Sequence, residues 1–228
     1  MKLNHQNIFL VVALMFSLSS CDSIYNFICC GCSEEDFALF VSVADDDLEA
    51  LKTYLENGGD PEFKCFDGRG RGFGAWSHLY WKVEESSSVE MVQYYIGYDL
   101  PQNIKDEMLE TFVGREEIEL ARLLVDVDAH ISSVASNCLE EYWEKIQYEV
   151  LVSVGYDFNW QDDNGNTLLM LHAKCRADDT SDELIAILQF LIEHGASTNI
   201  KNDNGKTAYD IAVNPKVKAF LAQFRSKK

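Results

Sequence analysis

Basic residues are scarce in this 228-residue chain: 19 lysines and arginines stand against 38 aspartates and glutamates, giving a formal net charge of −19. A field of that sign repels nucleic-acid phosphates and anionic lipid headgroups, so nucleic acid is excluded as a natural partner. The same field would accelerate encounter with a basic protein. The alternative is that the acidity only keeps the protein soluble and, as we expect for the isolated chain, monomeric.

The sequence also lacks the residue patterns of a catalytic or metal site. Its histidines have no Cys, Ser or Asp at a spacing that suggests a nucleophile with its base. Cys29, Cys30 and Cys32 are clustered, but a structural zinc site needs four ligands, and no matching Cys or His pair follows at the required spacing. We therefore expect no enzyme activity, no cofactor and no metal.

The apolar run near the N-terminus is too short to cross a membrane, which takes roughly 20 apolar residues. It extends from Ile8 to Phe16, after a polar start with Lys2 and before small residues that precede Cys21. This order of a basic start, an apolar stretch and small residues is typical of a signal peptide.

The quartet Leu18-Ser19-Ser20-Cys21 resembles the bacterial lipobox. The resemblance implies a cleaved signal peptide over residues 1–20, a lipid on Cys21, a lipidated linker over residues 21–36 and a mature protein anchored to the envelope in the periplasm. Asp22 resembles an inner-membrane retention signal. More than one acyl chain gives durable membrane attachment. The alternative is a plain secretory signal cleaved nearby.

The remaining cysteines are compatible with disulfides, because exported chains meet oxidising conditions and six cysteines remain if Cys21 is acylated. The sequence does not define their pairing. They are Cys29, Cys30, Cys32, Cys65, Cys138 and Cys175.

A repeated pattern covers much of the chain. Its clearest copy reads LQFLIEHGASTN over residues 188–199 and IKNDNGKTAYDIA over residues 200–212. A second copy, DDNGNTLL, begins at Asp162, and a third, ADDDLEALKTYLENGGDP, covers residues 44–61. A period between 20 and 50 residues is typical of a solenoid.

The physical chemistry of these copies predicts helices with defined ends. Gly58 and Gly195 each follow an amphipathic stretch, where a left-handed residue closes a helix without strain only if it is glycine. Thr167 and Thr207 precede helical segments, where a hydroxyl can accept a bond from a free backbone N–H.

The middle of the chain keeps the rhythm with a degenerate sequence. If Gly58, Gly97, Asp128, Gly155 and Gly195 are equivalent, the intervals are 39, 31, 27 and 40 residues, scattered about a repeat of ~33 residues.

These motifs strongly resemble the ankyrin repeat, in which a helix ending in a glycine is followed by a turn and the next helix pair. The resemblance implies an all-α solenoid of about five to six helix pairs over residues 37–228, irregular in the middle. A different solenoid of helical pairs is the structural alternative. Ankyrin proteins generally bind other proteins through their loop fingers and the concave face of their inner helices.

Two segments are candidate fingers. The stretch from Gly68 to Gly74 lacks the Lys-Ser/Thr ending of a phosphate loop, and we interpret it as an expanded finger. The second candidate segment lies around residue 160. Large rings in loops have less core to enter than rings on helices, although core packing remains the alternative for most. The predicted partner-binding residues are Phe66, Arg69, Arg71, Phe73, Trp76, Trp160, Asp162, Asp163 and Asn164.

Acidic ankyrin lipoproteins tethered to the envelope resemble immunity proteins, which neutralise antibacterial toxins, including phospholipases delivered by type VI secretion. The resemblance implies a protein that binds a basic toxin and blocks it by occlusion. One alternative is a housekeeping periplasmic scaffold or adaptor that supports an envelope enzyme. Another is a secreted protein that binds host proteins, which the lipobox disfavours.

Overall fold

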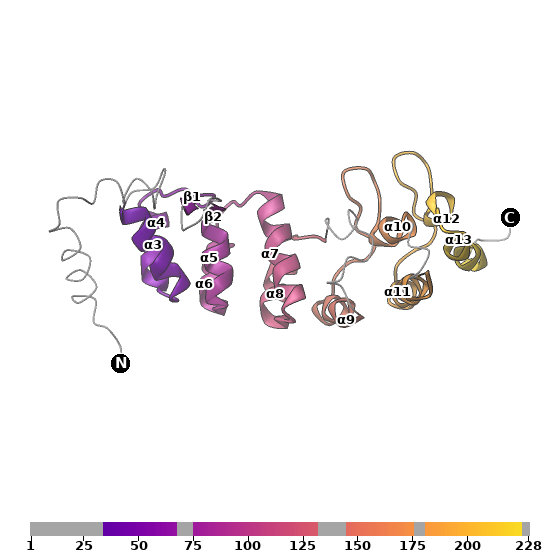
Figure 1. Cartoon of the computed structure of the whole chain (residues 1–228), viewed down its shortest axis with the longest axis horizontal. Coiled ribbons are helices and arrows are strands. Elements are labelled where there is room, and N and C mark those ends of the chain that lie inside the picture. The colour runs from indigo at the N-terminus through magenta and orange to yellow at the C-terminus, as the bar shows by residue number, and fades with distance from the viewer. Residues whose placement is uncertain (1–33, 68–74, 132–144, 176–180, 225–228) are drawn as a thin grey trace. The chain divides into compact units, whose positions relative to one another are not determined.

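The computed structural model describes residues 34–67, 75–131, 145–175 and 181–224. The chain divides into two compact units, residues 1–91 and residues 92–228. Cys21 and the predicted signal peptide lie outside the described residues. Figure 1 shows the helices and strands of each unit.

The first unit contains helix pairs and a β-hairpin. Its elements are α3 (Glu34–Ala44), α4 (Leu48–Glu56), β1 (Lys64–Asp67), β2 (Ala75–His78), α5 (Leu79–Ser86) and the start of α6 (Val89–Tyr95). The strands are antiparallel, with Lys64 opposite His78 and Asp67 opposite Ala75. Helix α3 packs on both α4 and α5. Phe40, Leu51 and Leu79 are among the buried side chains.

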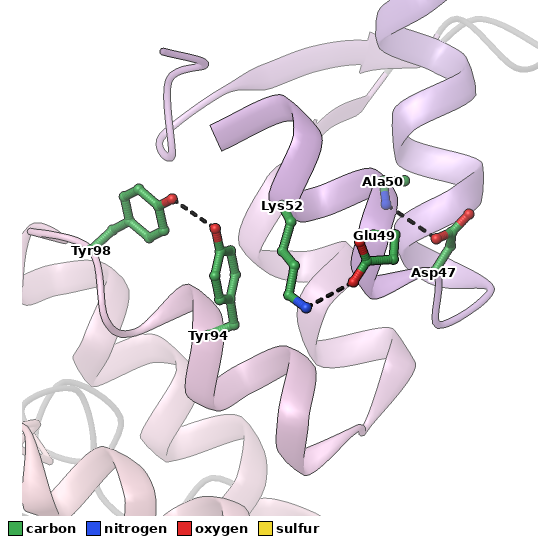
Figure 2. Close-up of polar contacts among 6 residues, drawn as sticks. All are labelled: Asp47, Glu49, Ala50, Lys52, Tyr94 and Tyr98. Carbon is green, nitrogen blue, oxygen red and sulfur yellow. Dashed lines mark hydrogen bonds and ion pairs between the residues drawn. The ribbon is translucent and has the colours of Figure 1, made fainter. Parts of the chain in front are cut away.

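Local side-chain contacts fix the start of α4. Asp47 caps this helix, because its carboxylate accepts a hydrogen bond of 3.1 Å from the Ala50 N–H (Figure 2). One turn into the helix, Lys52 pairs with Glu49 at 2.8 Å. An acidic N-cap satisfies a backbone donor that the helix leaves free and also interacts favourably with the helix dipole.

The second unit repeats one packing scheme along the chain. Its helices are α7 (Gln102–Gly114), α8 (Ile118–Asp126), α9 (Lys145–Val154), α10 (Leu168–Ala173), α11 (Ser181–Glu193), α12 (Ala208–Ile211), α13 (Pro215–Leu221) and the 3-10 helix η2 (Ala222–Phe224). Within pairs, α7 packs on α8, α10 on α11 and α12 on α13. Between neighbouring pairs, α8 packs on α9, α10 on α12 and α11 on α13.

The predicted ankyrin-like, all-α repeat fold is confirmed, with helix pairs in the expected order. The pairs that pack on each other within one unit are α3–α4, α7–α8, α10–α11 and α12–α13. Residues 132–144, which precede α9, lie outside the described residues. Within the described residues, the strands β1 and β2 are the departure from a purely helical chain. No helix in the described ranges is long and apolar enough to span a membrane.

The predicted helix ends are confirmed at four of the five positions. Gly58, Asp128, Gly155 and Gly195 all have a positive φ, and Asp128 adopts this left-handed conformation, at φ 63°, without being a glycine. Gly97 was expected to do the same and does not. The chain instead leaves α6 through two consecutive tight turns, in which the N–H groups of Gly97 and Tyr98 bond to carbonyls three residues back. In this stretch the Tyr98 hydroxyl also lies 3.0 Å from the Tyr94 hydroxyl (Figure 2).

A histidine lies in the core of the second unit. His172 on α10 is 1% exposed, and its Nε2 lies 3.0 Å from the hydroxyl of Tyr148 on α9. Its Nδ1 has no hydrogen-bond partner among the described residues. Burial lowers the pKa of His172 from 6.5 to about 4, because the charged imidazolium would lose its solvation.

The buried histidine predicts a loss of stability in mild acid. Between pH 6.5 and about 4, residue 172 binds a proton in the unfolded chain but stays neutral in the folded chain. The free energy of unfolding therefore falls as pH falls. At pH 5 the cost is about 2 kcal/mol relative to pH 7. Urea unfolding of the wild type and of His172→Gln, which cannot titrate at this position, measures this cost. The difference in free energy of unfolding between the two proteins should change by about 2 kcal/mol between pH 7 and pH 5. An equal pH dependence in both proteins would contradict the assignment.

Candidate functional site

Two fingers of the second unit share one turn geometry, and they form the candidate binding site. They cover residues 155–167, which lead into α10, and residues 194–207, which lead into α12 (Figure 1). In the 155–167 finger, the Asp162 N–H donates to the Asn166 carbonyl at 2.9 Å. The Asp162 carboxylate accepts the N–H groups of Asn164, at 2.9 Å, and Asn166, at 2.7 Å. One side chain thereby satisfies the donors that the turn leaves free.

The 194–207 finger repeats this geometry forty residues later with an amide in place of the carboxylate. The Asn202 N–H donates to the Lys206 carbonyl at 2.9 Å. The Asn202 side-chain oxygen accepts the N–H groups of Asn204, at 3.1 Å, and Lys206, at 3.0 Å. Asp162 and Asn202 therefore have the same structural role.

The threonines at the end of each finger begin the next helix. The Thr167 hydroxyl accepts the Met170 N–H at 3.4 Å, as predicted. At Thr207, the Asp210 carboxylate accepts both the Thr207 N–H, at 3.1 Å, and its hydroxyl, at 3.0 Å. The helix start is thus secured at both positions, at the second one chiefly by an aspartate that reaches back to the cap.

The two fingers are joined by hydrogen bonds between residues far apart in the sequence. The Asn202 amide donates to the Asn166 side-chain oxygen at 2.9 Å, and both side chains are buried. The Asp203 N–H donates to the Asn164 carbonyl at 3.1 Å. Because buried polar groups are costly unless paired, these contacts hold the fingers side by side in one arrangement.

Further polar contacts extend this ladder toward the base of the fingers. Asn159 donates to the Gly195 carbonyl at 3.0 Å and accepts the Ser197 N–H at 2.7 Å. Gln161 donates to the carbonyl of Gly165 in its own finger and, at 3.2 Å, to that of Lys201 in the next. The backbone of one finger is thus bound along its length to side chains of the other.

The predicted residues of the 155–167 finger have different environments. Asp163 and Asn164 have exposed side chains at the tip of the finger. Asp162 is half-buried, and its carboxylate holds the turn. Trp160 is also half-buried, and its ring stacks on His130 with centroids 4.0 Å apart and an interplanar angle of 15°.

The predicted residues of the first unit fall in or beside the β-hairpin. Phe66 on β1 lies opposite Trp76 on β2 in the strand register. Arg69, Arg71 and Phe73 lie outside the described residues. The finger predicted over residues 68–74 lies between these two strands and outside the described residues.

Sequence reasoning missed His130, Asp106 and the two paired asparagines. Asp106 on α7 is 7% exposed, and its carboxylate accepts the His130 N–H at 2.7 Å and a Gln102 N–H at 2.7 Å. This contact anchors the chain that follows α8. The contacts between Asp106 and His130 and between Asn166 and Asn202 join residues 24 and 36 positions apart, and no local sequence pattern reports them.

The sulfur and metal chemistry of the described residues is sparse. Cys175 is buried, and its thiol donates to the Leu171 carbonyl at 3.9 Å. Within the described ranges, no group of three or more His, Cys, Asp or Glu side chains lies close enough to hold a metal ion.

Comparison with known proteins finds likeness at the level of structure alone. No protein-family model matches the chain, and no curated protein matches it. Among solved structures, the chain is similar to the crystal structure of EF0377, an ankyrin repeat protein, with 19% identity and a TM-score of 0.43. The match covers 82% of this chain and 98% of the other. The repeated helix pairs and the two C-terminal fingers define the fold of this chain.

A matched pair of glycines tests the contact between the fingers. Gly165 and Gly205 occupy the same turn position, with φ 73° and 70°, but a Cβ on Gly165 would lie 2.8 Å from the Asp203 backbone nitrogen, whereas a Cβ on Gly205 would meet nothing within 4 Å. Gly205→Ala should cost about 1 kcal/mol for the left-handed backbone alone. Gly165→Ala should cost about 2–4 kcal/mol, because overpacking is added.

Urea unfolding of the two alanine variants measures this difference. Both substitutions change the unfolded chain in the same way, so the difference between them reports on the folded state. Equal destabilisation would show that the two fingers do not pack closely at Gly165.

Proposed function

We propose that this protein is an envelope-tethered binding module that captures a basic protein partner and blocks it by occlusion, as an immunity protein does with an antibacterial toxin. A phospholipase delivered by type VI secretion is the toxin class that we propose. The observation that carries the proposal is the rigid, acidic 155–167 finger. Its turn is held by its own side chains, so the exposed Asp163 and Asn164 are presented in a fixed position.

Preorganisation makes such a finger suited to binding. A loop that is already ordered loses little conformational entropy when a partner binds, and this lowers the cost of association. The bonds from Asn202 to Asn166 and from Asp203 to Asn164 supply that order here.

The charge of the fingers supports a basic partner. The 155–167 finger contains Asp157, Asp162 and Asp163 and no lysine or arginine, whereas the 194–207 finger has Lys201 and Lys206 beside Asp203. The whole chain carries a formal charge of −19. Long-range attraction would speed the encounter, and the acidic finger would orient it.

A lipid on Cys21 would keep the module where an injected toxin arrives. Tethering replaces a search through the whole compartment with a high local concentration at the membrane. A toxin that acts on lipids must approach the same surface, so occlusion there would precede damage.

Contact competition tests the proposed function. A strain that lacks this gene should be killed by its parent when the parent's secretion system is active, because the parent still delivers the toxin. Killing should stop when the toxin gene is removed from the parent, which identifies the partner. If the deletion strain survives contact with the armed parent, the protein is not an immunity protein, and a housekeeping scaffold becomes the better account.

Charge reversal tests the role of the finger. Asp163→Arg should slow association with the toxin identified by competition about tenfold at low salt, and the loss should shrink as salt is added. Asp126→Arg, an equal charge change at an exposed position at the end of α8, should have a smaller effect. Surface plasmon resonance measures both. Equal effects would mean that net charge acts without a role for the finger.

Lipid attachment is tested by substitution of Cys21. Cys21→Ser should abolish incorporation of labelled palmitate and move the protein from the membrane fraction to the soluble fraction, because the acyl chains supply the attachment. Cys29→Ser, a change at a neighbouring cysteine, should leave both unchanged. Retained label in Cys21→Ser would refute the lipid anchor on this residue.

A further inference from the structure

Two aromatic rings from different parts of the second unit form a stacked pair. The Trp160 indole and the His130 imidazole lie nearly parallel, at 15°, with centroids 4.0 Å apart. Both side chains are partly exposed. Trp160 belongs to the 155–167 finger and His130 to the segment that follows α8. We call these two residues the stacked pair.

The backbone around the stacked pair is fixed by buried hydrogen bonds. Asp106 accepts the His130 N–H at 2.7 Å, and the Tyr156 hydroxyl accepts the Ile131 N–H at 3.1 Å. Tyr156 and Ile131 are both buried. The rings are therefore held in place before any partner arrives.

Three carboxylates act electrostatically on the imidazole of His130. The pKa of His130 is lowered by burial, which is the largest effect. The negative charges of Asp106, Asp128 and Asp157 raise it by less. The imidazole is therefore uncharged at neutral pH and does not repel a cation. Lys105 also acts on His130, and its ammonium donates to the Val127 carbonyl at 3.3 Å.

Two of these carboxylates are available to a partner. Asp128 and Asp157 are exposed, and neither forms an ion pair with a residue in the part of the chain that the structure describes. One Asp157 oxygen accepts the Asn159 N–H at 2.9 Å. An aromatic surface and unneutralised carboxylates thus occur together.

We propose that the stacked pair and the carboxylates of Asp128 and Asp157 bind an arginine side chain of the basic partner. A guanidinium is planar, stacks on aromatic rings and donates several hydrogen bonds in its own plane, whereas a lysine ammonium is a compact, strongly hydrated charge. An arginine can therefore contact the rings and the carboxylates at once. This inference rests on the proposed function, because it names a contact that the proposed basic partner would make.

The competing account is that the stacked pair only joins two loops. In that case its loss would lower stability without changing which cation the protein prefers. The preference for arginine over lysine at equal charge separates the two accounts, because general electrostatic attraction treats both alike.

Nona-arginine and nona-lysine peptides serve as probes, titrated into the full chain in detergent by isothermal calorimetry at neutral pH. The wild type should bind nona-arginine about fivefold more tightly than nona-lysine. Trp160→Leu should reduce this ratio to near one, and Trp160→Phe should keep most of it, because phenylalanine restores an aromatic face. Trp81→Leu, which removes a 38% exposed tryptophan of the first unit, should leave the ratio unchanged.

The carboxylates are tested separately. The double variant Asp128→Asn with Asp157→Asn keeps the residue-157 oxygen that accepts the Asn159 N–H. It should weaken the binding of both peptides several-fold, whereas Asp126→Asn should weaken it less. Equal wild-type affinity for the two peptides, or an unchanged ratio in folded Trp160→Leu, would overturn the inference. Neither result depends on the toxin, so this inference can fail while the immunity proposal stands, and survival of the deletion strain would refute the immunity proposal alone.

Discussion

The candidate binding surface depends on one side-chain oxygen in the turn of each C-terminal finger. A tight turn leaves backbone N–H groups without partners, and in each finger a single residue, Asp162 or Asn202, accepts two of them. The amide of Asn202 can donate as well as accept, and it uses this ability to reach Asn166 in the neighbouring finger. A carboxylate at residue 202 would lose that donor, so the choice of asparagine there links the two repeats.

Much of the fold could be predicted from the sequence because its signals are local. Gly195 with its amphipathic helix, and Thr167 before an apolar run, each predict a helix end from a few neighbouring residues. The left-handed helix end at Asp128 was predicted correctly from its position in the repeat, although this residue is not a glycine. Gly97 was misplaced because the direction in which the chain leaves α6 depends on two successive tight turns, which a glycine alone does not encode.

The site was harder to predict because its contacts join distant residues. Asp162 is an exception, because its carboxylate holds the turn through the N–H groups of Asn164 and Asn166, two and four residues along the chain, and this local role was interpreted as partner binding. His130 has an ordinary place in a loop, and its stacking on Trp160 crosses thirty residues of sequence. Packing of this kind is decided by tertiary structure, and a single sequence has no local pattern that reports it.

The division of labour within the 155–167 finger has a consequence for how such a protein can change over generations. Asp162 and Asn166 fix the shape of the finger, while the side chains of Asp163 and Asn164 at its tip are exposed. Substitutions at the tip alter what a visiting protein meets without loosening the scaffold beneath. The same backbone can therefore acquire a new recognition specificity through one or two surface changes, at little cost in folding.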